Sequence, residues 1–330
     1  MSIVYRGAGH GDMERISALM ARAMPRDVVS AMRLGRTLLL EPNHDPRGLV
    51  IAEHPEDGVI GVAYGTCAEH GVPSLPTSGY MTLACVDPRH RRRGVGCELF
   101  GRVRDHLAER GATSLTVAGY PQAYFWPGVD ADEHPEGIAF LEECGLTPSG
   151  TAAAMSLDLD AWSISESVRD LERTRRAEGF RFGPATLEDL PEVISFASKR
   201  LARDWGEVLR EAALRDPAVV RRIVMARDPL GVVVGFATYG AYGDTLERFG
   251  PFGIDETRRG TGLGRILLSL TLMKMRSEAA HGAWFLWTGE ESPAGHLYAS
   301  TGFTVSRRFT VMRTDLQAPQ SAKAPRNEDQ

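Results

Sequence analysis

Two short glycine-rich segments have the residue types and spacing to bind an anion. They read Arg-Arg-Arg-Gly-Val-Gly at positions 91–96 and Arg-Gly-Thr-Gly-Leu-Gly at positions 259–264, so Gly94 corresponds to Gly262. A strand-like stretch ending in Val-Asp or Ile-Asp precedes each segment, and a helix-like pattern follows it. Glycines allow close approach of the backbone, and the N–H groups of a first helical turn attract negative charge. We therefore predict a phosphate-binding turn in each half of the chain.

Two other phosphate motifs do not fit these segments. A P-loop requires Gly-Lys followed by Ser or Thr, but Cys97 and Arg265 follow the last glycines. The dinucleotide fingerprint requires a third glycine, and Leu99 stands at that position after the first segment. Both segments also follow several predicted strands, whereas the dinucleotide motif follows the first strand of its unit.

A second pair of segments places a tyrosine in only one half of the chain. Residues 297–303 read Leu-Tyr-Ala-Ser-Thr-Gly-Phe, and residues 140–146 read Phe-Leu-Glu-Glu-Cys-Gly-Leu. Tyr298 therefore corresponds to Leu141. A tyrosine hydroxyl can donate a hydrogen bond and give a proton to a leaving group, whereas leucine can do neither.

The elements that must position these motifs recur in the same order, which indicates a duplicated domain. In each half a helix, a strand, a second helix and a last strand are expected after the glycine segment. The strands expected before the segments are residues 48–53, 58–69 and 80–86 in the first half, and residues 231–242 and 246–254 in the second. The last strands, near residues 152–159 and 305–314, are expected to close their own copies.

The repeat also predicts the domain limits. An N-terminal domain is expected at residues 1–160, a helical linker at 161–178 and a C-terminal domain at 179–316. Residues 317–330 are polar and contain two prolines, so a disordered tail is expected there.

The two glycine segments and the Leu-Tyr-Ala-Ser-Thr-Gly-Phe segment resemble the GNAT acetyltransferase family, in a tandem arrangement of two such domains. The resemblance implies an α/β (α+β) fold in which each domain is a mixed, mostly antiparallel sheet flanked by helices. It also implies a V-shaped splay between strands 4 and 5, with residues 81–86 and 249–254 as strand 4.

The resemblance further implies that acetyl-CoA lays its pantetheine in the V and its pyrophosphate on the glycine segment. A different acyl-CoA could occupy the second site. The residues expected to bind the cofactor are Ala84, Cys85, Val86, Arg91, Arg92, Arg93, Gly94, Val95 and Gly96 in the first domain, and Phe252, Gly253, Ile254, Arg259, Gly260, Thr261, Gly262, Leu263 and Gly264 in the second.

By the same resemblance Tyr298 is the general acid, so the C-terminal domain is expected to be catalytic and the N-terminal domain mainly to bind acetyl-CoA. The candidate general bases are Glu247 and Glu291, with Glu290 beside the latter, and a water chain is an alternative. A backbone N–H near Ile254 is the expected donor to the thioester oxygen.

In the first domain the aromatic segment at residues 123–132 could line an acceptor pocket or plug it. Tyr120 or Tyr124 could replace the missing acid there. The acceptor is expected to contact residues 24–45 and 202–219, which correspond to variable loops.

We thus expect an N-acetyltransferase, or broader acyltransferase, that acts on a small-molecule amine, with the amines of specialised metabolism among the candidates. The alternatives are a non-catalytic acyl-CoA-binding or sensing protein and a protein N-acetyltransferase. The expected state is a monomer or homodimer.

Composition agrees with a small anionic ligand rather than a polymer. The net charge is −5 and the pI about 6.0, which disfavours a nucleic-acid partner. No apolar run is long enough to span a bilayer, and the N-terminus lacks signal-peptide features, so a cytoplasmic protein without a membrane partner is expected. The four cysteines show no metal-ligand spacing.

Overall fold

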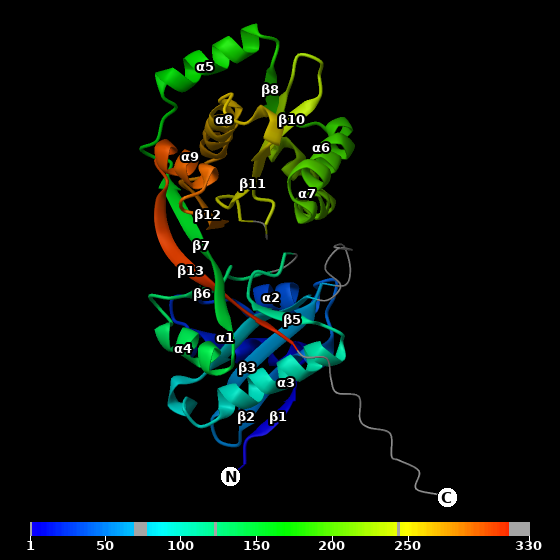
Figure 1. Cartoon of the computed structure of the whole chain (residues 1–330), viewed down its shortest axis with the longest axis vertical. Coiled ribbons are helices and arrows are strands. Elements are labelled where there is room, and N and C mark those ends of the chain that lie inside the picture. Colours follow the sequence, from blue (N-terminus) through cyan, green and yellow to red (C-terminus); the bar gives the residue numbers. More distant parts are fainter. Residues whose placement is uncertain (1, 69–77, 122–123, 243–244, 317–330) are drawn as a thin grey trace, which may run out of the picture. The chain divides into compact units, whose positions relative to one another are not determined.

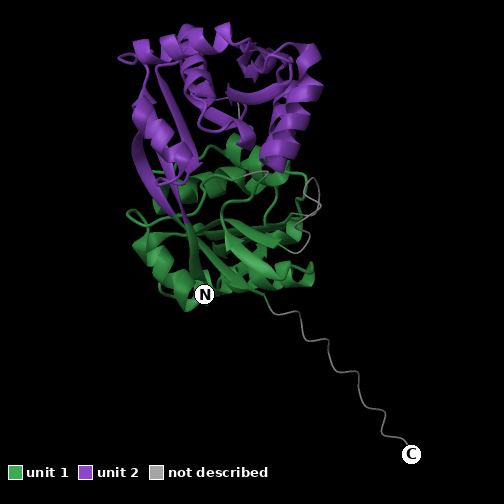
Figure 2. Cartoon of the chain, turned by 45° about the horizontal axis from the view of Figure 1, so that its top comes forward, with its two compact units in different colours: residues 1–150, 310–330 green, residues 151–309 purple. Residues whose placement is uncertain are grey.

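The computed structural model describes residues 2–68, 78–121, 124–242 and 245–316. These residues divide into two units of similar design (Figure 2). Unit 1 comprises residues 1–150 and 310–330, and unit 2 comprises residues 151–309. The predicted fold class is confirmed, because each unit contains a mostly antiparallel sheet flanked by helices (Figure 1).

Unit 1 is built on a sheet with helices on both faces. Four successive antiparallel strands are followed by a fifth that runs parallel to the fourth. Its strands are β1 (Val4–Gly7), β2 (Leu49–His54), β3 (Gly58–Cys67), β4 (Ser78–Val86), β5 (Ser114–Val117) and β6 (Val129–Asp130). Its helices are α1 (Met13–Ala23), α2 (Ala31–Leu34), α3 (Val95–Glu109) and α4 (Pro135–Glu143).

Unit 2 repeats this order after a helix that has no counterpart before β1. Figure 1 shows α8 and α9 on one side of β11, with α6 and α7 on the other. Its strands are β8 (Arg181–Pro184), β9 (Val224–Arg227), β10 (Val233–Tyr239), β11 (Phe249–Ile254) and β12 (Gly282–Thr288). Its helices are α5 (Glu166–Ala177), α6 (Leu190–Phe196), α7 (Arg203–Arg215), α8 (Leu263–Ser277) and α9 (Pro293–Thr301).

The helix after each glycine segment packs closely on its sheet. Leu99 and Val103 of α3 are buried, as their helical spacing predicts. A Cβ atom at Gly61 of β3 would lie 2.8 Å from Cδ1 of Leu99. In unit 2, a Cβ atom at Gly235 of β10 would lie 3.1 Å from Cδ1 of Leu267. Small strand residues therefore let both helices approach the sheet and fix the position of their first turns.

The last strands of the two sequence copies are exchanged between the units. β7 (Thr147–Asp158) follows the first copy, but its residues 153–158 pair with β12 in unit 2. β13 (Thr304–Asp315) follows the second copy, but its residues 312–315 pair with β5 in unit 1. The expectation that each strand closes its own copy is therefore wrong. The domain limits at residues 1–160 and 179–316 were derived from the sequence repeat, and they stay a prediction.

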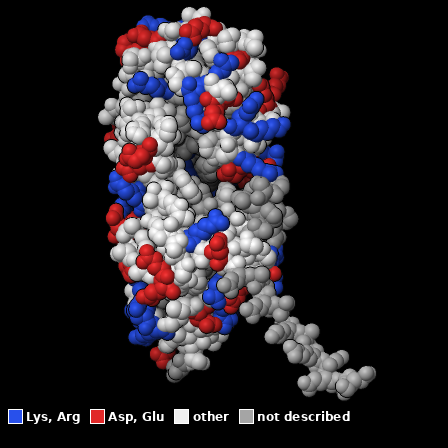
Figure 3. Space-filling view, viewed as in Figure 1, with Lys and Arg blue, Asp and Glu red and all other residues white. Residues whose placement is uncertain are grey.

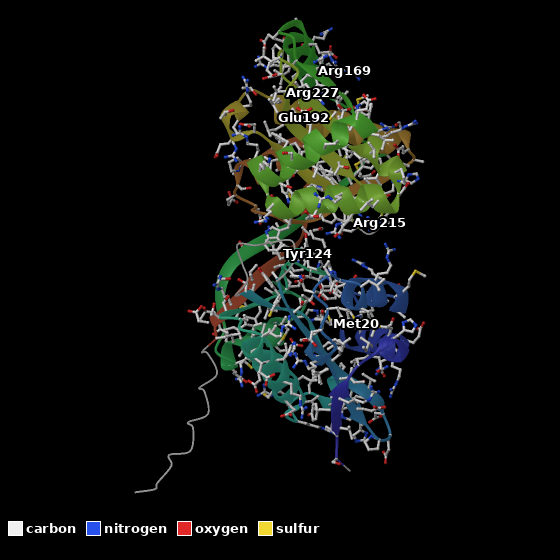
Figure 4. The ribbon with its side chains drawn as sticks, turned by 90° about the vertical axis from the view of Figure 1, so that its right-hand side faces the viewer. Met20, Tyr124, Arg169, Glu192, Arg215 and Arg227 are labelled. Carbon is white, nitrogen blue, oxygen red and sulfur yellow. The ribbon has the colours of Figure 1, made fainter. Side chains whose placement is uncertain are left out.

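Charges of both signs are interspersed over the face of the molecule shown in Figure 3. Many form ion pairs, such as Arg227 with Glu192 at 2.7 Å, whose side chains lie together in unit 2 (Figure 4). Within the described residues, no helix is both long and apolar enough to cross a membrane. The predicted tail, residues 317–330, lies outside the described residues.

Candidate functional site

The strand before each glycine segment diverges from its parallel neighbour. In unit 1 only the first part of β4, from Ser78 to Met81, pairs with β5, and the N–H of Ala118 donates to the carbonyl of Met81 at 2.7 Å. In unit 2 the two strands meet at a parallel bridge between Arg248 and Trp284, and the Trp284 N–H donates to the carbonyl of Glu247 at 3.0 Å. Beyond these contacts each pair forms the expected V.

A β-bulge marks the point of divergence in both units. In unit 1, Tyr64 and Gly65 are adjacent on β3, yet they pair with Leu83 and Met81 of β4, which leaves Thr82 as the extra residue. A register shift occurs at the same point between β10 and β11 of unit 2. In the alignment that matches Gly94 with Gly262, Thr82 corresponds to Gly250, so the bulges belong to the internal repeat.

The strand segments beyond the bulges are open on one edge. Ala84 is exposed and Cys85 and Val86 are half-buried, and all three follow the last residue of β4 that pairs with β5. The three predicted counterparts in unit 2, Phe252, Gly253 and Ile254, are also half-buried. An extended ligand could therefore lie along each strand and hydrogen-bond with its backbone.

The glycine segments form the same turn in both units. Gly94 (φ +81°) and Gly262 (φ +83°) both have left-handed backbones, and α3 and α8 begin at the next residues, Val95 and Leu263. The first amides of such a helix have no carbonyl partner in their own helix. These amides, together with the positive end of the helix dipole, can bind a phosphate.

The arginines of the two segments have different roles. The guanidinium of Arg91 donates to the carbonyls of Val86 and Ala23, at 3.2 and 3.1 Å, so it holds the turn to β4 and α1. Arg92 and Arg93 are exposed. In unit 2, Arg259 is exposed and pairs with a neighbouring carboxylate at 2.8 Å. The exposed arginines are able to turn toward an anion, whereas Arg91 shapes the site.

Tyr298 touches both arms of the V in unit 2. Its ring centroid lies 4.4 Å from that of Phe285 on β12, and 6.1 and 6.0 Å from those of Phe249 and Phe252 on β11. Burial raises the pKa of its hydroxyl. Within the described residues the structure gives this hydroxyl no hydrogen bond, so it remains available to a ligand. At the corresponding place in unit 1, Leu141 is buried in the core.

None of the three glutamates hydrogen-bonds Tyr298 within the described part of the chain. Glu247 precedes β11, and its Oε1 accepts from the N–H groups of His281 and Gly282, at 3.0 and 3.2 Å. Glu290 is held by two guanidinium nitrogens of Arg308 at 2.8 Å, and this pairing lowers its pKa.

Glu291 is still less confined than these two. Its side chain is 91% exposed and lies 3.8 Å from the His296 ring.

These features agree with what comparison with known proteins finds. A family model described as "Acetyltransferase (GNAT) family" matches residues 17–145 and 185–303, which are most of the chain. The chain belongs to the GNAT acetyltransferase family. It is accordingly an acyl-CoA-dependent N-acetyltransferase.

Two curated relatives and one solved structure match this GNAT protein over most of both chains. Mycothiol acetyltransferase of Clavibacter sepedonicus is 28% identical over 298 residues, which are 87% of each chain. That of Thermobispora bispora is 26% identical and covers 91% of this chain and 94% of its own. A tandem GNAT protein from the clavulanic acid biosynthesis pathway has 16% identity and a TM-score of 0.63, and covers 96% of this chain and 99% of its own. This last likeness concerns the fold.

Acetyl-CoA, which GNAT proteins use, fits the residues present in both units. The free amides and left-handed glycines at α3 and α8 suit a pyrophosphate, and the open edges of β4 and β11 suit a pantetheine arm. When bound, it would supply the acyl thioester.

The coenzyme turn of unit 2 is covered by a helix that the sequence pattern indicated only as a linker. A Cβ atom at Gly262 would lie 2.5 Å from Cδ2 of Leu171 on α5. The guanidinium of Arg175, also on α5, donates to the carbonyl of Thr261 at 3.0 Å. At Gly94 in unit 1, a Cβ atom would have no described atom within 4 Å. The linker helix is thus a wall of one coenzyme turn.

Unit 1 contains a buried carboxylate that no sequence motif indicated. Glu41 lies inside the predicted acceptor loop, where its charge alone did not distinguish it from exposed acids. Its carboxylate accepts from the hydroxyls of Tyr64 at 2.6 Å, Thr66 at 2.8 Å and Tyr120 at 3.0 Å, and from the Asn43 N–H at 2.7 Å. Burial and this carboxylate raise the pKa of both tyrosines. Tyr120 is therefore committed to the network.

The connection between β5 and α4 is long in unit 1. It comprises positions 118–134, of which 118–121 and 124–134 are described, whereas positions 289–292 alone join β12 to α9 in unit 2. Phe125, in this connection, is 2% exposed and packs in a cluster with Leu83 and Tyr64. The Nε1 of Trp126 donates to Asp27 at 2.8 Å. Part of the predicted aromatic segment, residue 123, lies outside the described residues.

The segment at residues 202–219, which was expected to be a variable loop, is mostly the helix α7, so that expectation is wrong. It contains an acid that the sequence did not single out. Asp204, in the first turn of α7, is half-buried, and burial raises its pKa. The next residue, Trp205, packs on β11, since a Cβ atom at Gly253 would lie 3.0 Å from its ring. Asp204 is thus close in sequence to a residue that contacts the V, although no motif indicated it.

Proposed function

We propose that this enzyme transfers an acyl group from acyl-CoA to a small-molecule amine, and that the transfer takes place in unit 2. The observation that carries the proposal is the position of Tyr298. Its ring touches Phe285 and Phe249, one from each arm of the V, and its hydroxyl keeps the capacity to donate. Unit 1 has Leu141 at that place and cannot supply the same acid.

In the proposed reaction the amine nitrogen bonds to the acyl carbon and the carbon–sulfur bond breaks. Tyr298 gives its proton to the departing thiolate, and a base takes one proton from the amine. Glu247 and Glu291 are the bases proposed from the sequence. We add Asp204 because its carboxyl is partly desolvated and the next residue, Trp205, packs on β11. A backbone N–H near Ile254 is the proposed donor to the thioester oxygen.

We assign the coenzyme to the turns and strands already described. In unit 2 the pantetheine would pair with residues 252–254 and the pyrophosphate would lie on residues 259–264. In unit 1 the corresponding residues are 84–86 and 91–96. The two turns have almost the same glycine φ angles, which supports two coenzyme sites of one design.

Unit 1 is proposed mainly to bind acetyl-CoA. Its β5–α4 connection contributes Phe125 to the same buried cluster as Leu83, the residue after the bulge, where an acceptor would have to reach the thioester. Of the alternatives open for residues 123–132, a plug agrees best with this burial.

The names of the relatives suggest which amines to examine first. Several are called mycothiol acetyltransferases at 25–28% identity, so mycothiol-related amines belong at the head of a panel that also includes amines of specialised metabolism.

The decisive experiment replaces Tyr298 by phenylalanine and measures thiol release from acetyl-CoA with that panel. Loss of the acid should lower kcat by about 100-fold while acetyl-CoA still binds. As a control, Tyr5→Phe removes a tyrosine hydroxyl from β1 of unit 1 and should leave kcat unchanged. Full activity of Tyr298→Phe with every amine would refute the assignment of the acid.

A further inference from the structure

Three buried side-chain polar atoms lack a hydrogen-bond partner among the described residues. They are Oγ1 of Thr82, Oγ1 of Thr238 and Nε2 of His134. Leaving a buried hydroxyl without a partner costs free energy, so each such atom requires an explanation. Two of the three, Thr82 and Thr238, lie where the register shifts at the bulges of the two units.

Thr82 occupies a special position on its strand. It is the extra residue of the β4 bulge, and it directly follows Met81, the last residue that pairs with β5. The threonine is only 4% exposed, whereas Ala84, further along the strand, is exposed on the open edge. The residue with the unpaired hydroxyl is thus located at the closed end of the V, where the pairing of β4 with β5 stops.

We infer that the Thr82 hydroxyl donates a hydrogen bond to the acyl carbonyl of the thioester bound in unit 1. This inference rests on the proposed coenzyme site of unit 1. A thioester carbonyl is an acceptor that arrives only with the acylated coenzyme, because free coenzyme A ends in a thiol, a poor acceptor. The ligand class is therefore a short acyl thioester, and unit 1 distinguishes it from the free thiol.

Unit 2 cannot make this contact from the same position. Gly250, the counterpart of Thr82, has no side chain, and a Cβ atom there would have no described atom within 4 Å. Thr238, the unpaired hydroxyl of unit 2, belongs to β10, one strand away from β11. A side-chain hydroxyl that favours acylated over free coenzyme from this position is thus a property of unit 1. A unit that binds without transferring would then respond to the ratio of acyl-CoA to CoA.

The test compares Thr82→Val, which keeps the shape and removes the hydroxyl, with Thr82→Ser, which keeps the hydroxyl. Calorimetric titration of the full chain with acetyl-CoA and with CoA gives the Kd at each site. The binding event of unit 1 is identified as the one lost in Gly94→Glu, because a carboxylate there opposes the phosphates and meets no described atom.

Thr82→Val should weaken acetyl-CoA binding at unit 1 by about tenfold and leave CoA binding within about twofold. Thr82→Ser should keep the wild-type preference, and Thr238→Val should leave the unit 1 affinities unchanged. The Tm of Thr82→Val without ligand should not fall, since no hydrogen bond within the protein is lost.

Equal weakening of both ligands, or of neither, would overturn the role of Thr82 while leaving the coenzyme site in place. If Gly94→Glu removed no binding event, the coenzyme site of unit 1 would itself be wrong, and the inference would fail with it.

Discussion

Unit 1 and unit 2 share the half of the fold that would hold a coenzyme and differ in the half that would hold an acceptor. Both begin a long helix directly after a left-handed glycine, and both have a bulge on the strand that leads to that glycine. They differ where β5 and β12 lead to the next helix, through positions 118–134 in unit 1 but only positions 289–292 in unit 2.

This difference has a physical basis. A phosphate-binding turn depends on backbone conformation, which allows few changes once glycine occupies a position with positive φ. The acceptor side depends on loops, whose length can change without disturbing the sheet. In unit 1 that freedom has placed Phe125 and a saturated carboxylate, Glu41, beside the V. The duplicated units thus keep the same glycine turn and differ in the connection that follows the next strand.

The largest effect is expected from a charge in the exchanged strand. Met312 is fully buried and pairs with Val117 of unit 1, so Met312→Asp should destabilise unit 1 by about 4 kcal/mol. Hydrogen exchange should accelerate first in β4 and β5, although residue 312 belongs to the second sequence copy. Arg313→Asp, at the exposed neighbour, should cost less than about 0.5 kcal/mol. Faster exchange in β12 before β5 would contradict the exchange of strands.

That exchange could not be predicted from the sequence, whereas the turns could. The turns at Gly94 and Gly262 could be predicted because the strand, the glycines and the helix that define each turn lie within a short stretch of chain. A strand such as residues 305–314 has the same alternation of apolar and polar residues whichever sheet edge it joins. Its partner is decided by the whole fold.

The same limit applied to the site. Tyr298 was predicted because it stands within a motif. The structure places its ring against both arms of the V, and its role as the acid stays a prediction. Glu41 and Asp204 became visible only through burial, since an acidic residue in a loop is usually solvated. Of the candidate bases, Glu247 accepts from backbone amides and the neighbouring Glu290 pairs with Arg308, whereas Glu291 is exposed, and a sequence pattern cannot indicate such contacts.

An intermediate effect should separate the two coenzyme turns. Gly260 and Arg92 occupy equivalent positions in the repeat, and both have left-handed backbones, with φ of +77° and +58°. Gly260→Glu places a carboxylate at the turn of unit 2 and should lower kcat/KM by about 100-fold, or ~2.7 kcal/mol. Arg92→Glu should lower it by no more than about threefold, because transfer is assigned to unit 2.

Native mass spectrometry with acetyl-CoA provides the control for this pair. Each variant should lose one of two bound coenzymes, which shows that both substitutions act on binding. If Arg92→Glu abolished transfer as strongly as Gly260→Glu does, catalysis could not be confined to unit 2.

The smallest effect concerns the acids that directly precede α1 in unit 1 and α6 in unit 2. Asp12 is bound by two guanidinium nitrogens of Arg6 at 2.8 Å, and this pairing is the main cause that lowers its pKa to about 2. Asp189 of unit 2 also has a lowered pKa, but chiefly because it accepts from the backbone N–H of Thr186 at 2.8 Å. An asparagine oxygen can still accept from the N–H of Thr186. It cannot replace the charge that pairs with Arg6 at position 12 or, as a smaller contribution, the charge that pairs with Arg227 at position 189.

Asp12→Asn should therefore destabilise unit 1 by about 1 kcal/mol at pH 7, and Asp189→Asn should destabilise unit 2 by less. Because the folded pKa of Asp12 lies below its unfolded value of about 3.9, its stabilisation is complete above that pH. It should disappear as the pH falls from about 4 to about 2, where wild type and variant converge. Hydrogen exchange in α1 and α6 across this pH range measures the stability change of each variant. If the difference in stability between wild type and Asp12→Asn stayed constant down to the lowest pH, the charge of Asp12 would not be the cause of its effect on α1.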